Sequence, residues 1–256
     1  MSIGRHIIRL EEATSTNDVA KRYAKSGEAE GLVIVAKRQT EGRGRLGRQW
    51  ASPEGGLYLS VLLKPDLDPK ELTNLTVYSA VPVAKAIENI TGLKTVLKWP
   101  NDVQIEGRKV AGLLVEGTGQ QGKIAYVVLG IGINVNSKTK ELGVEGATSL
   151  SDEAGQRIDT ERLLDELLLM LRRYYERFLK KDYPDDEYVE RSSVLGHQIE
   201  AVVGRETFRG KALYLAPDGS LVIKSDEGLV LRLSWVNDTS IRVTDSAKST
   251  DNPTKD

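Results

Sequence analysis

Closely spaced strand segments in the middle of the chain constrain its fold more than any other feature. Four apolar, β-rich stretches follow one another there, separated by short turns such as Glu106-Gly107. They are Thr95–Trp99, Val103–Ile105, Val110–Gly117 and Ile124–Asn134. Runs of strands with helices set apart favour an α+β fold, in which helices pack on one face of the sheet.

Further strands and helices flank this run. Strand patterning occurs at His6–Leu10, Leu32–Lys37 and Leu57–Leu63, and helical patterning at Asn17–Lys25, Lys70–Ile90 and Thr160–Leu179. In the last of these segments apolar residues keep helical spacing from Leu163 to Phe178, which predicts an amphipathic helix that covers the core. The sequence therefore predicts a mixed or antiparallel sheet with helices on one face.

The residues after Gly196 differ from the preceding ones, because they form short strand segments without long helical patterns. Five short strand segments are separated by turn signals such as Ala216-Pro217-Asp218-Gly219, at a spacing of about 8–12 residues. The segments are Gln198–Val203, Thr207–Tyr214, Ser220–Lys224, Leu229–Leu233 and Ser240–Val243. This pattern predicts a small five-stranded β-barrel. We expect a first domain at residues 1–195, the barrel at 196–244 and a disordered polar tail at 245–256.

The composition excludes several classes of function. The 36 basic and 37 acidic residues nearly cancel, which argues against a surface built as a whole for nucleic acid or anionic membrane. The absence of cysteine excludes disulfides, thiolate metal sites and cysteine nucleophiles. No signal peptide and no apolar run of about 18 residues is found, so we expect a cytoplasmic protein that does not span a membrane.

The densest motif is a glycine- and arginine-rich segment, Gly42–Trp50. It matches the dinucleotide fingerprint G-x-G-x-x-G, but Ala51–Gly56 follows, which cannot form the helix that must hold a pyrophosphate. The glycines make the backbone mobile, and Arg43, Arg45 and Arg48 supply planar donors for phosphate or carboxylate. The segment predicts a loop that closes over an anionic, reactive intermediate, a solvated basic loop, or a loop that contacts nucleic acid.

A second cluster of polar residues lies at Lys98–Asp102. Because Pro100 forces a turn after a strand, Asn101 and Asp102 are expected between two strands, with their polar groups directed outward. Asp102 can hold Mg²⁺, orient an amine or cap the turn, and composition alone favours the cap.

Lys109 begins the apolar strand that ends at Glu116. A lysine at a strand end is usually solvated, but one that faces a pocket can pair with a substrate carboxylate and stabilise charge on a phosphoryl group. Gly112, within the same strand, indicates that a ligand or another backbone approaches closely.

Two shorter motifs have both structural and functional interpretations. In Gly130–Asn136 the glycines can form a bulge and Asn134 a turn, or the Asn134 amide can recognise an adenine edge. Ser15-Thr16-Asn17 is by default the cap of the helix that follows.

Together these motifs resemble those of the biotin protein ligase family, because they occur in the family's order. They are Ser15-Thr16-Asn17, Gln39 with Gly42–Trp50, Lys98–Asp102 with Lys109–Gly112, and Gly132–Asn134. The resemblance extends from Ile7 to about Val243. It implies a catalytic domain like those of class II synthetases, followed by a small SH3-like barrel.

The resemblance also implies a role for each matching residue. The residues that resemble a biotin pocket and its covering loop are Ser15, Thr16, Asn17, Gln39, Arg43, Gly44, Arg45, Lys109 and Gly112. Those that resemble contacts to ATP or the adenylate are Arg43, Arg45, Arg48, Trp50, Asn101, Lys109 and Asn134. Lys109, Arg45 and Asp102 are the implied catalytic residues, and Asp102 serves either Mg²⁺ or the acceptor lysine.

The implied reaction uses ATP and Mg²⁺ to convert biotin into biotinyl-5′-AMP, and then transfers biotin to a lysine. The acceptor is a biotin carboxyl carrier protein domain of a biotin-dependent carboxylase. Some family members carry an N-terminal DNA-binding domain, but here the Ser15 motif begins almost at once, so we expect a ligase that does not bind nucleic acid. Members often pair through sheet edges, which suggests a homodimer.

The sequence also allows two alternative functions. Lipoate or octanoate ligases share the catalytic fold, but they have a later His-Asp pair, and the histidines here, His6 and His197, lie outside the implied site. A nucleic-acid-binding module built on the arginine loop and the barrel is disfavoured by the near-zero net charge.

Overall fold

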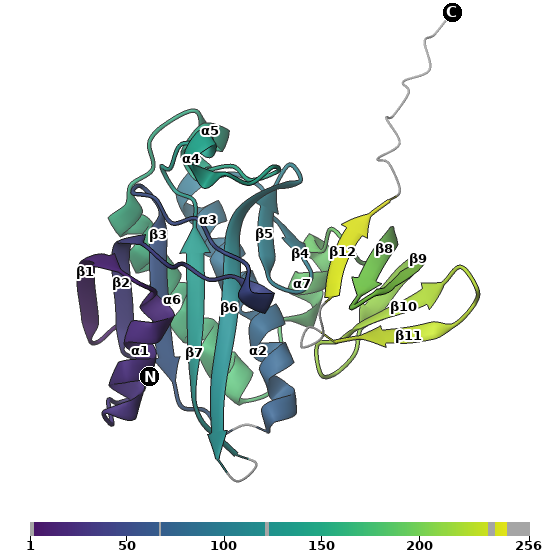
Figure 1. Ribbon diagram of the computed structural model, residues 1–256, viewed down its shortest axis with the longest axis horizontal. Helices are drawn as coiled ribbons and strands as arrows, with labels where there is room; N and C mark the ends of the chain where they lie inside the picture. The colour runs from purple at the N-terminus through teal and green to yellow at the C-terminus, as the bar shows by residue number, and fades with distance from the viewer. Residues whose placement is uncertain (1–2, 67, 121–122, 235–238, 245–256) are drawn as a thin grey trace, which may run out of the picture.

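Seven strands form the central sheet of the computed structural model, which describes residues 3–66, 68–120, 123–234 and 239–244 (Figure 1). The strands are β1 Ile7–Ala13, β2 Val33–Gln39, β3 Leu57–Leu63, β4 Val96–Lys98, β5 Asp102–Ile105, β6 Arg108–Gln120 and β7 Lys123–Ile133. Their order is β1-β2-β3-β7-β6-β5-β4. Only the pairing of β1 with β2 is parallel among these described strands, so the sheet is mixed, as predicted. The tail predicted at residues 245–256 lies outside the described residues.

Alternating side chains divide this sheet into two faces. In β3, Leu57, Leu59 and Val61 belong to the main hydrophobic core, whereas Leu62 belongs to a second, smaller core. The alternation follows from the geometry of a strand, in which successive side chains point to opposite faces. Both faces of β3 are covered, which explains why the whole strand is buried and reads as a continuous apolar run.

The two longest helices, α3 (Ala80–Thr91) and α6 (Thr160–Leu179), cover the face of the main core, as predicted. Helix α1 (Thr16–Lys25) lies on the opposite face, in front of the sheet in Figure 1, where Val19 and Ala20 join the smaller core. The helices are thus not confined to one face, contrary to the prediction, because the alternating apolar residues of β2 and β3 make both faces hydrophobic. Helix α6 has the predicted bounds. It begins where the carboxylate of Asp159 accepts hydrogen bonds from two backbone N–H groups of the first turn.

The segment predicted as one helix, Lys70–Ile90, is divided in the structure. A short 3₁₀ turn is followed by α2 (Leu72–Tyr78), and α3 begins at Ala80. Pro82 explains the division, because it has no N–H group to donate to the carbonyl of Tyr78 and its ring would clash with that carbonyl in a continuous helix. The helix therefore restarts with Pro82 in its first turn.

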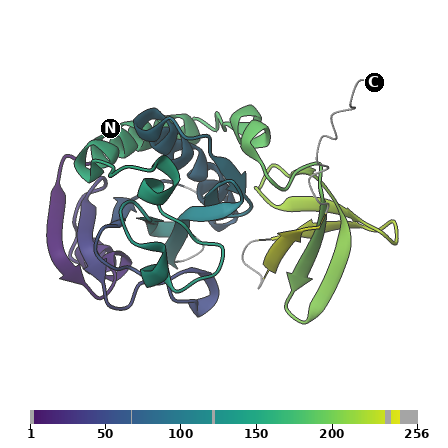
Figure 2. The same ribbon diagram turned by 90° about the horizontal axis from the view of Figure 1, so that it is seen from above.

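The C-terminal strands form a separate antiparallel sheet (Figure 2) in the order β11-β10-β9-β8-β12. They are β8 Gln198–Val203, β9 Glu206–Leu215, β10 Leu221–Ser225, β11 Val230–Leu233 and β12 Thr239–Val243. The five predicted strands are thus present. The predicted boundary near Leu195 falls in the short connection before β8 and stays a prediction.

The turn between β9 and β10 docks this small sheet onto the rest of the protein. The indole Nε1 of Trp99 donates to the carbonyl of Gly219 at 3.0 Å, and the amide of Asn74 donates to the carbonyl of Pro217 at 2.8 Å. Trp99 and Gly219 are both buried. Trp99 is separated from Asn101 and Asp102 only by Pro100, so the small sheet is attached next to the second polar cluster.

Several short elements have no counterpart in the prediction. They are α4 Thr139–Leu142, α5 Leu150–Ala154, α7 Asp185–Arg191 and a 3₁₀ turn at Arg45–Gly47. Across the described part of the chain, no helix is both long and apolar enough to cross a membrane.

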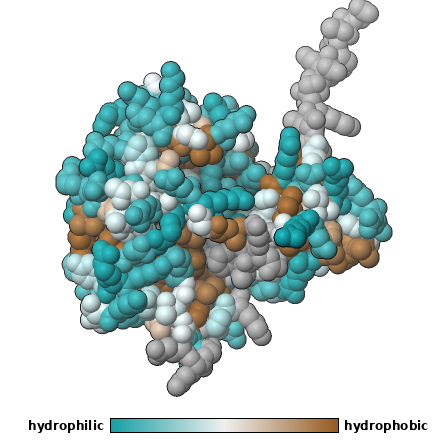
Figure 3. All heavy atoms as spheres, in the orientation of Figure 1, coloured by the Kyte–Doolittle hydropathy of each residue, from teal (hydrophilic) through white to brown (hydrophobic). Residues whose placement is uncertain are grey.

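The surface that carries α1, β6 and β7 is mostly hydrophilic (Figure 3). One group of apolar atoms lies at the outer end of the small sheet, where Leu229 and Val230 are exposed, and others lie at the left edge of this view. The surface beside α1 is therefore mostly polar.

Candidate active site

A cavity of about 190 Å³ opens on the α1 side of the central sheet. Its walls come from the start of α1, the loop between β2 and β3, the β4–β5 turn, strands β6 and β7, and strand β12 of the small sheet. All predicted site residues line this cavity except Asn134. They are Ser15, Thr16, Asn17, Gln39, Arg43, Gly44, Arg45, Arg48, Trp50, Asn101, Asp102, Lys109 and Gly112.

Glycines of β6 and β7 form a floor without side chains. Gly112 pairs with Gly132, and Trp50 lies across them, because a Cβ atom placed on Gly132 would be 2.5 Å from the Nε1 atom of Trp50. A Cβ atom on Gly112 would be 2.9 Å from the Cζ3 atom of the same ring. These glycines are therefore required for close approach.

One end of the cavity is lined by a network of uncharged polar side chains. Gln39 accepts hydrogen bonds at its Oε1 atom from the backbone N–H of Thr16, at 2.8 Å, and from the Thr16 hydroxyl, at 3.1 Å. The hydroxyl of Ser60 lies 2.8 Å from that of Thr16 and donates to Oδ1 of Asn17 at 2.5 Å. These buried groups hold one another in place and present mixed donors and acceptors to a ligand.

Ser15 occupies the N-cap position of α1, but its side chain makes no cap hydrogen bond. The side chain is buried and lines the cavity. Ser15 thus occupies the predicted cap position. The side chains of Ser15, Thr16 and Asn17 nevertheless line the cavity, and those of Thr16 and Asn17 take part in its hydrogen-bond network.

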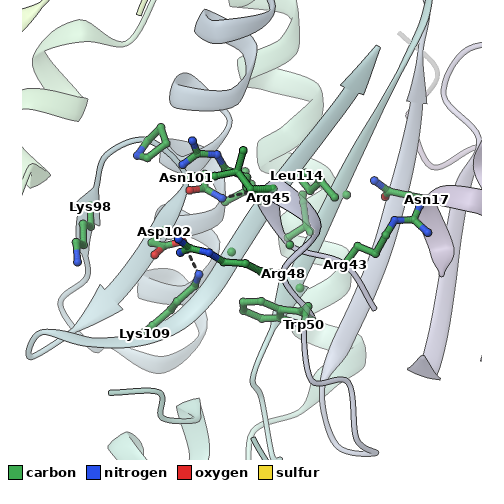
Figure 4. Close-up of a pocket in the computed structure, with 18 of the residues that line it drawn as sticks. Asn17, Arg43, Arg45, Arg48, Trp50, Lys98, Asn101, Asp102, Lys109 and Leu114 are labelled. Atoms are coloured by element: carbon green, nitrogen blue, oxygen red, sulfur yellow. Dashed lines mark hydrogen bonds and ion pairs between the residues drawn. The ribbon is translucent and has the colours of Figure 1, made fainter. Parts of the chain in front are cut away.

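The arginine-rich segment Gly42–Trp50 is a loop that doubles back on itself. The backbone N–H of Gly44 donates to the carbonyl of Arg48 at 2.7 Å, and that of Trp50 donates to Gly42 at 2.9 Å. Figure 4 shows Arg45 and Arg48 extending toward the side of Asn101 and Asp102. In the same view Arg43 extends in the opposite direction, toward Asn17.

Lys109 lies at the centre of the charged end. Its Nζ atom is 2.5 Å from Oδ1 of Asp102 and 5.0 Å from the centroid of the Trp50 ring. The ring face attracts the ammonium electrostatically. The indole Nε1 of Trp50 is buried and has no hydrogen-bond partner among the described residues, which leaves a donor for a bound molecule.

Asn101 and Asn134 are buried amides with structural partners. Asn101 donates to the carbonyl of Leu113 at 2.7 Å and lines the cavity. Asn134 lies outside the lining residues and donates to the carbonyl of Thr148 at 3.0 Å. The backbone N–H of Thr148 in turn donates to the carbonyl of Lys109, so Asn134 supports the segment that fixes the backbone of Lys109.

The sequence did not predict some of the residues that line or support the cavity. Ser60 could have been predicted from the sequence, because it is the one serine in the largely apolar run Leu57–Leu63. Thr239, Ser240 and Ile241 come from the small sheet, and no motif marks them. Their contribution depends on how the two sheets dock.

The comparisons with known proteins agree with this geometry. Residues 10–134 match the family model described as the Biotin/lipoate A/B protein ligase family. The Bifunctional ligase/repressor BirA of Bacillus subtilis is 35% identical over 233 residues, which is 89% of this chain and 72% of that protein. The Biotin--[acetyl-CoA-carboxylase] ligase of Paracoccus denitrificans is 30% identical over 86% of this chain and 94% of that protein.

Solved structures give the same result. The biotin protein ligase from Aquifex aeolicus in complex with biotin and ATP superposes with a TM-score of 0.78. Its sequence is 33% identical, and the match covers 94% of this chain and 100% of that chain. Fold and site thus define an enzyme of the biotin/lipoate ligase class. Within that class, the chain belongs to the biotin protein ligase family.

Proposed function

We propose that this protein is a biotin protein ligase that forms biotinyl-5′-AMP from biotin and ATP and then transfers biotin to a lysine of a carrier domain. One observation carries the proposal. A polar, uncharged pocket at Thr16, Asn17 and Gln39 shares one cavity with a cationic cluster around Lys109. Such a cavity suits a neutral ring system with a carboxylate at its far end, next to a nucleoside triphosphate.

In the first step a carboxylate oxygen of biotin attacks the α-phosphorus of ATP. A phosphorus–oxygen bond forms to biotin, the bond to the β-phosphate oxygen breaks, and pyrophosphate leaves. Lys109, Arg45 and Arg48 stabilise the negative charge on the phosphoryl oxygens. Trp50 packs against the adenine ring, and the arginine loop keeps water from the anhydride.

In the second step the neutral amine of the acceptor lysine attacks the carbonyl carbon of the adenylate. The carbon–nitrogen bond forms, AMP leaves, and the amine loses its proton. A free lysine has a pKa near ~10.4, so a group that orients the ammonium or accepts its proton assists the reaction. Asp102 lines the cavity and already holds one ammonium, that of Lys109, and it is the candidate for this role.

The residues of the cavity could hold Mg²⁺ only if the phosphates of the substrate supplied further ligands. Among the described residues no group of three metal-ligating side chains is found, and Asp102 is the carboxylate of the cavity lining. Mg²⁺ is commonly held by one or two carboxylates together with substrate phosphates. As the alternative to its role toward the acceptor lysine, Asp102 would hold the ion, which would supply charge neutralisation at the phosphates.

The acceptor in this proposal is a biotin carboxyl carrier protein domain of a biotin-dependent carboxylase. The name of the Paracoccus denitrificans relative, which specifies acetyl-CoA-carboxylase, supports that assignment. We further propose a cytoplasmic enzyme that acts without nucleic acid, paired as a homodimer.

Biotin-dependent exchange of pyrophosphate into ATP tests the function directly. The purified protein should catalyse exchange with biotin and not with lipoate. Exchange with lipoate alone would make the protein a lipoate ligase, and no exchange with either acid would favour a binding protein. Transfer is then tested with a purified carrier domain and its variant that lacks the acceptor lysine.

A further inference from the structure

Arg43 of the arginine loop pairs with a carboxylate of helix α1. Its two terminal nitrogens lie 2.5 and 2.6 Å from the two carboxylate oxygens of Asp18, in the first turn of α1. This is a bidentate arginine–carboxylate pair, the geometry with the greatest strength and directional specificity. Both side chains are about one-third exposed, so solvent screens the pair less than a surface pair.

A second carboxylate lies beside this pair. Glu116, on β6, is 3.7 Å from Arg43 and 2.6 Å from the ammonium of Lys21. Its other contact is the side-chain amide of Asn17, which donates to it at 2.6 Å. Two carboxylates and two cations therefore form one closed cluster, and this cluster touches a residue of the polar pocket.

Glu116 also determines the orientation of the Asn17 amide. The NH₂ group of Asn17 faces Glu116, so its carbonyl oxygen faces the hydroxyl of Ser60. A carboxylate accepts hydrogen bonds only, which excludes the flipped amide. The loop, helix α1, strand β6 and the pocket are thereby joined through the side chains of Arg43, Asp18, Glu116 and Asn17.

We propose that Asp18 and Glu116 are positioning residues that fasten the arginine loop over the cavity by pairing with Arg43. This role presupposes the ligase activity proposed above. Arg43 acts in this proposal through its carboxylate partners, which engage both terminal nitrogens of its guanidinium. The phosphoryl charge is left to Arg45, Arg48 and Lys109, which lie at the other end of the cavity (Figure 4).

Limited trypsin cleavage of the ligand-free protein tests the fastening without relying on catalysis. Asp18→Asn keeps the size of the side chain and removes its charge. We expect cleavage after Arg45 and Arg48 to rise about tenfold, since loss of a charge-assisted hydrogen bond shifts an equilibrium by that order. Asp18→Glu should restore much of the protection. Glu161→Gln, which breaks the remote bidentate pair with Arg9, is the matched control and should cleave like the wild type.

A double-mutant comparison separates fastening from a general loss of stability. In an Arg43→Met background, Asp18→Asn should add little further cleavage after Arg45 and Arg48. Unchanged cleavage in Asp18→Asn, or an equal rise in both backgrounds, would overturn the proposal. Circular dichroism checks folding, and if Asp18→Asn does not fold, Glu116→Gln replaces it with the same two expected outcomes.

Kinetics provide a second readout that a purely structural role would not give. Asp18→Asn should raise KM for biotin about tenfold and change kcat of pyrophosphate exchange less than about twofold, because the loop must close before chemistry. A matching fall in kcat without a rise in KM would contradict the assignment. If the wild type shows no exchange at all, the ligase function fails, while the cleavage experiment still decides whether Asp18 fastens the loop.

Discussion

The ammonium of Lys109 lies 2.5 Å from a carboxylate oxygen of Asp102, inside the cavity that joins the polar pocket to the arginine loop. The two residues come from neighbouring strands, β6 and β5, in a register fixed by the sheet. A substrate phosphate that approaches Lys109 therefore meets a lysine whose position is already set. Preorganised charge of this kind stabilises a transition state without the cost of reorganising the site.

Lys109→Ala should abolish adenylation while the fold persists. Removing a preorganised charge at a phosphoryl group lowers the rate by roughly 10²-fold or more. Pyrophosphate exchange measures the loss, and circular dichroism measures folding. Lys123→Ala, which removes an exposed lysine of β7, is the control and should retain full exchange. Retained exchange in Lys109→Ala would remove this lysine from its proposed role.

Gly132→Ala should weaken ATP binding by displacing Trp50. The new methyl group would lie 2.5 Å from Nε1 of Trp50, which is closer than any side chain tolerates, so the indole must move. We expect KM for ATP to rise about tenfold, since packing of an aromatic ring contributes on the order of 1 kcal/mol.

Gly117→Ala is the control for this substitution, on the neighbouring strand β6. Its methyl group meets the end of the flexible Leu72 side chain, which can rotate away. Equal effects of Gly117→Ala and Gly132→Ala on KM for ATP would show that the ring position is not responsible.

Glu187→Gln should destabilise the protein at neutral pH and much less at acidic pH. Burial by itself raises the pKa of Glu187, but hydrogen bonds from Lys85, Tyr174 and Arg177 outweigh burial and lower the pKa from 4.5 to about 2. A carboxylate whose pKa is lower in the folded state contributes stability above its unfolded pKa. That contribution is lost as the pH falls toward 2.

Urea unfolding of the Glu187→Gln variant measures this contribution. We expect a loss of about 2 kcal/mol at pH 7, and a difference from the wild type that shrinks between about pH 5 and pH 2. Glu190→Gln, on the exposed side of the same helix, should change the free energy of unfolding by less than about 0.5 kcal/mol. A difference that does not vary with pH would contradict the ionic explanation.

Trp99→Phe should loosen the attachment of the small sheet. The substitution keeps the apolar ring but leaves the buried carbonyl of Gly219 without its donor, which costs about 1–3 kcal/mol. Hydrogen exchange should accelerate for amides of β12 and stay unchanged for those of β3. Equal acceleration in both strands would indicate general destabilisation of the protein.

Local patterning was enough to predict most strands and the long helix α6. The apolar run of β3 and the spacing of Leu163, Leu167 and Leu171 in α6 depend on residues close in sequence. The division of α2 from α3 was missed, although Pro82 indicates it. Helices α4 and α5 have only four and five residues, which is too short for a helical period to show.

The sequence identified site residues that stand in motifs, but it could not describe how they interact. The Arg43–Asp18 pair and the Lys109–Asp102 pair depend on register and on the path of a loop. Asn134 was expected at the adenylate, and the structure instead places its amide against Thr148, outside the cavity lining. The predicted roles themselves stay predictions.

Strand β12 supplies one wall of the cavity and comes last in sequence among the strands that the structure describes. While a ribosome is still translating the small sheet, the seven central strands and the arginine loop have already emerged. The nascent polypeptide can therefore fold its central sheet, but its substrate site stays open on one side until Thr239–Ile241 dock. An enclosed cavity thus depends on elements that lie far apart in the sequence, from α1 and β6 to β12.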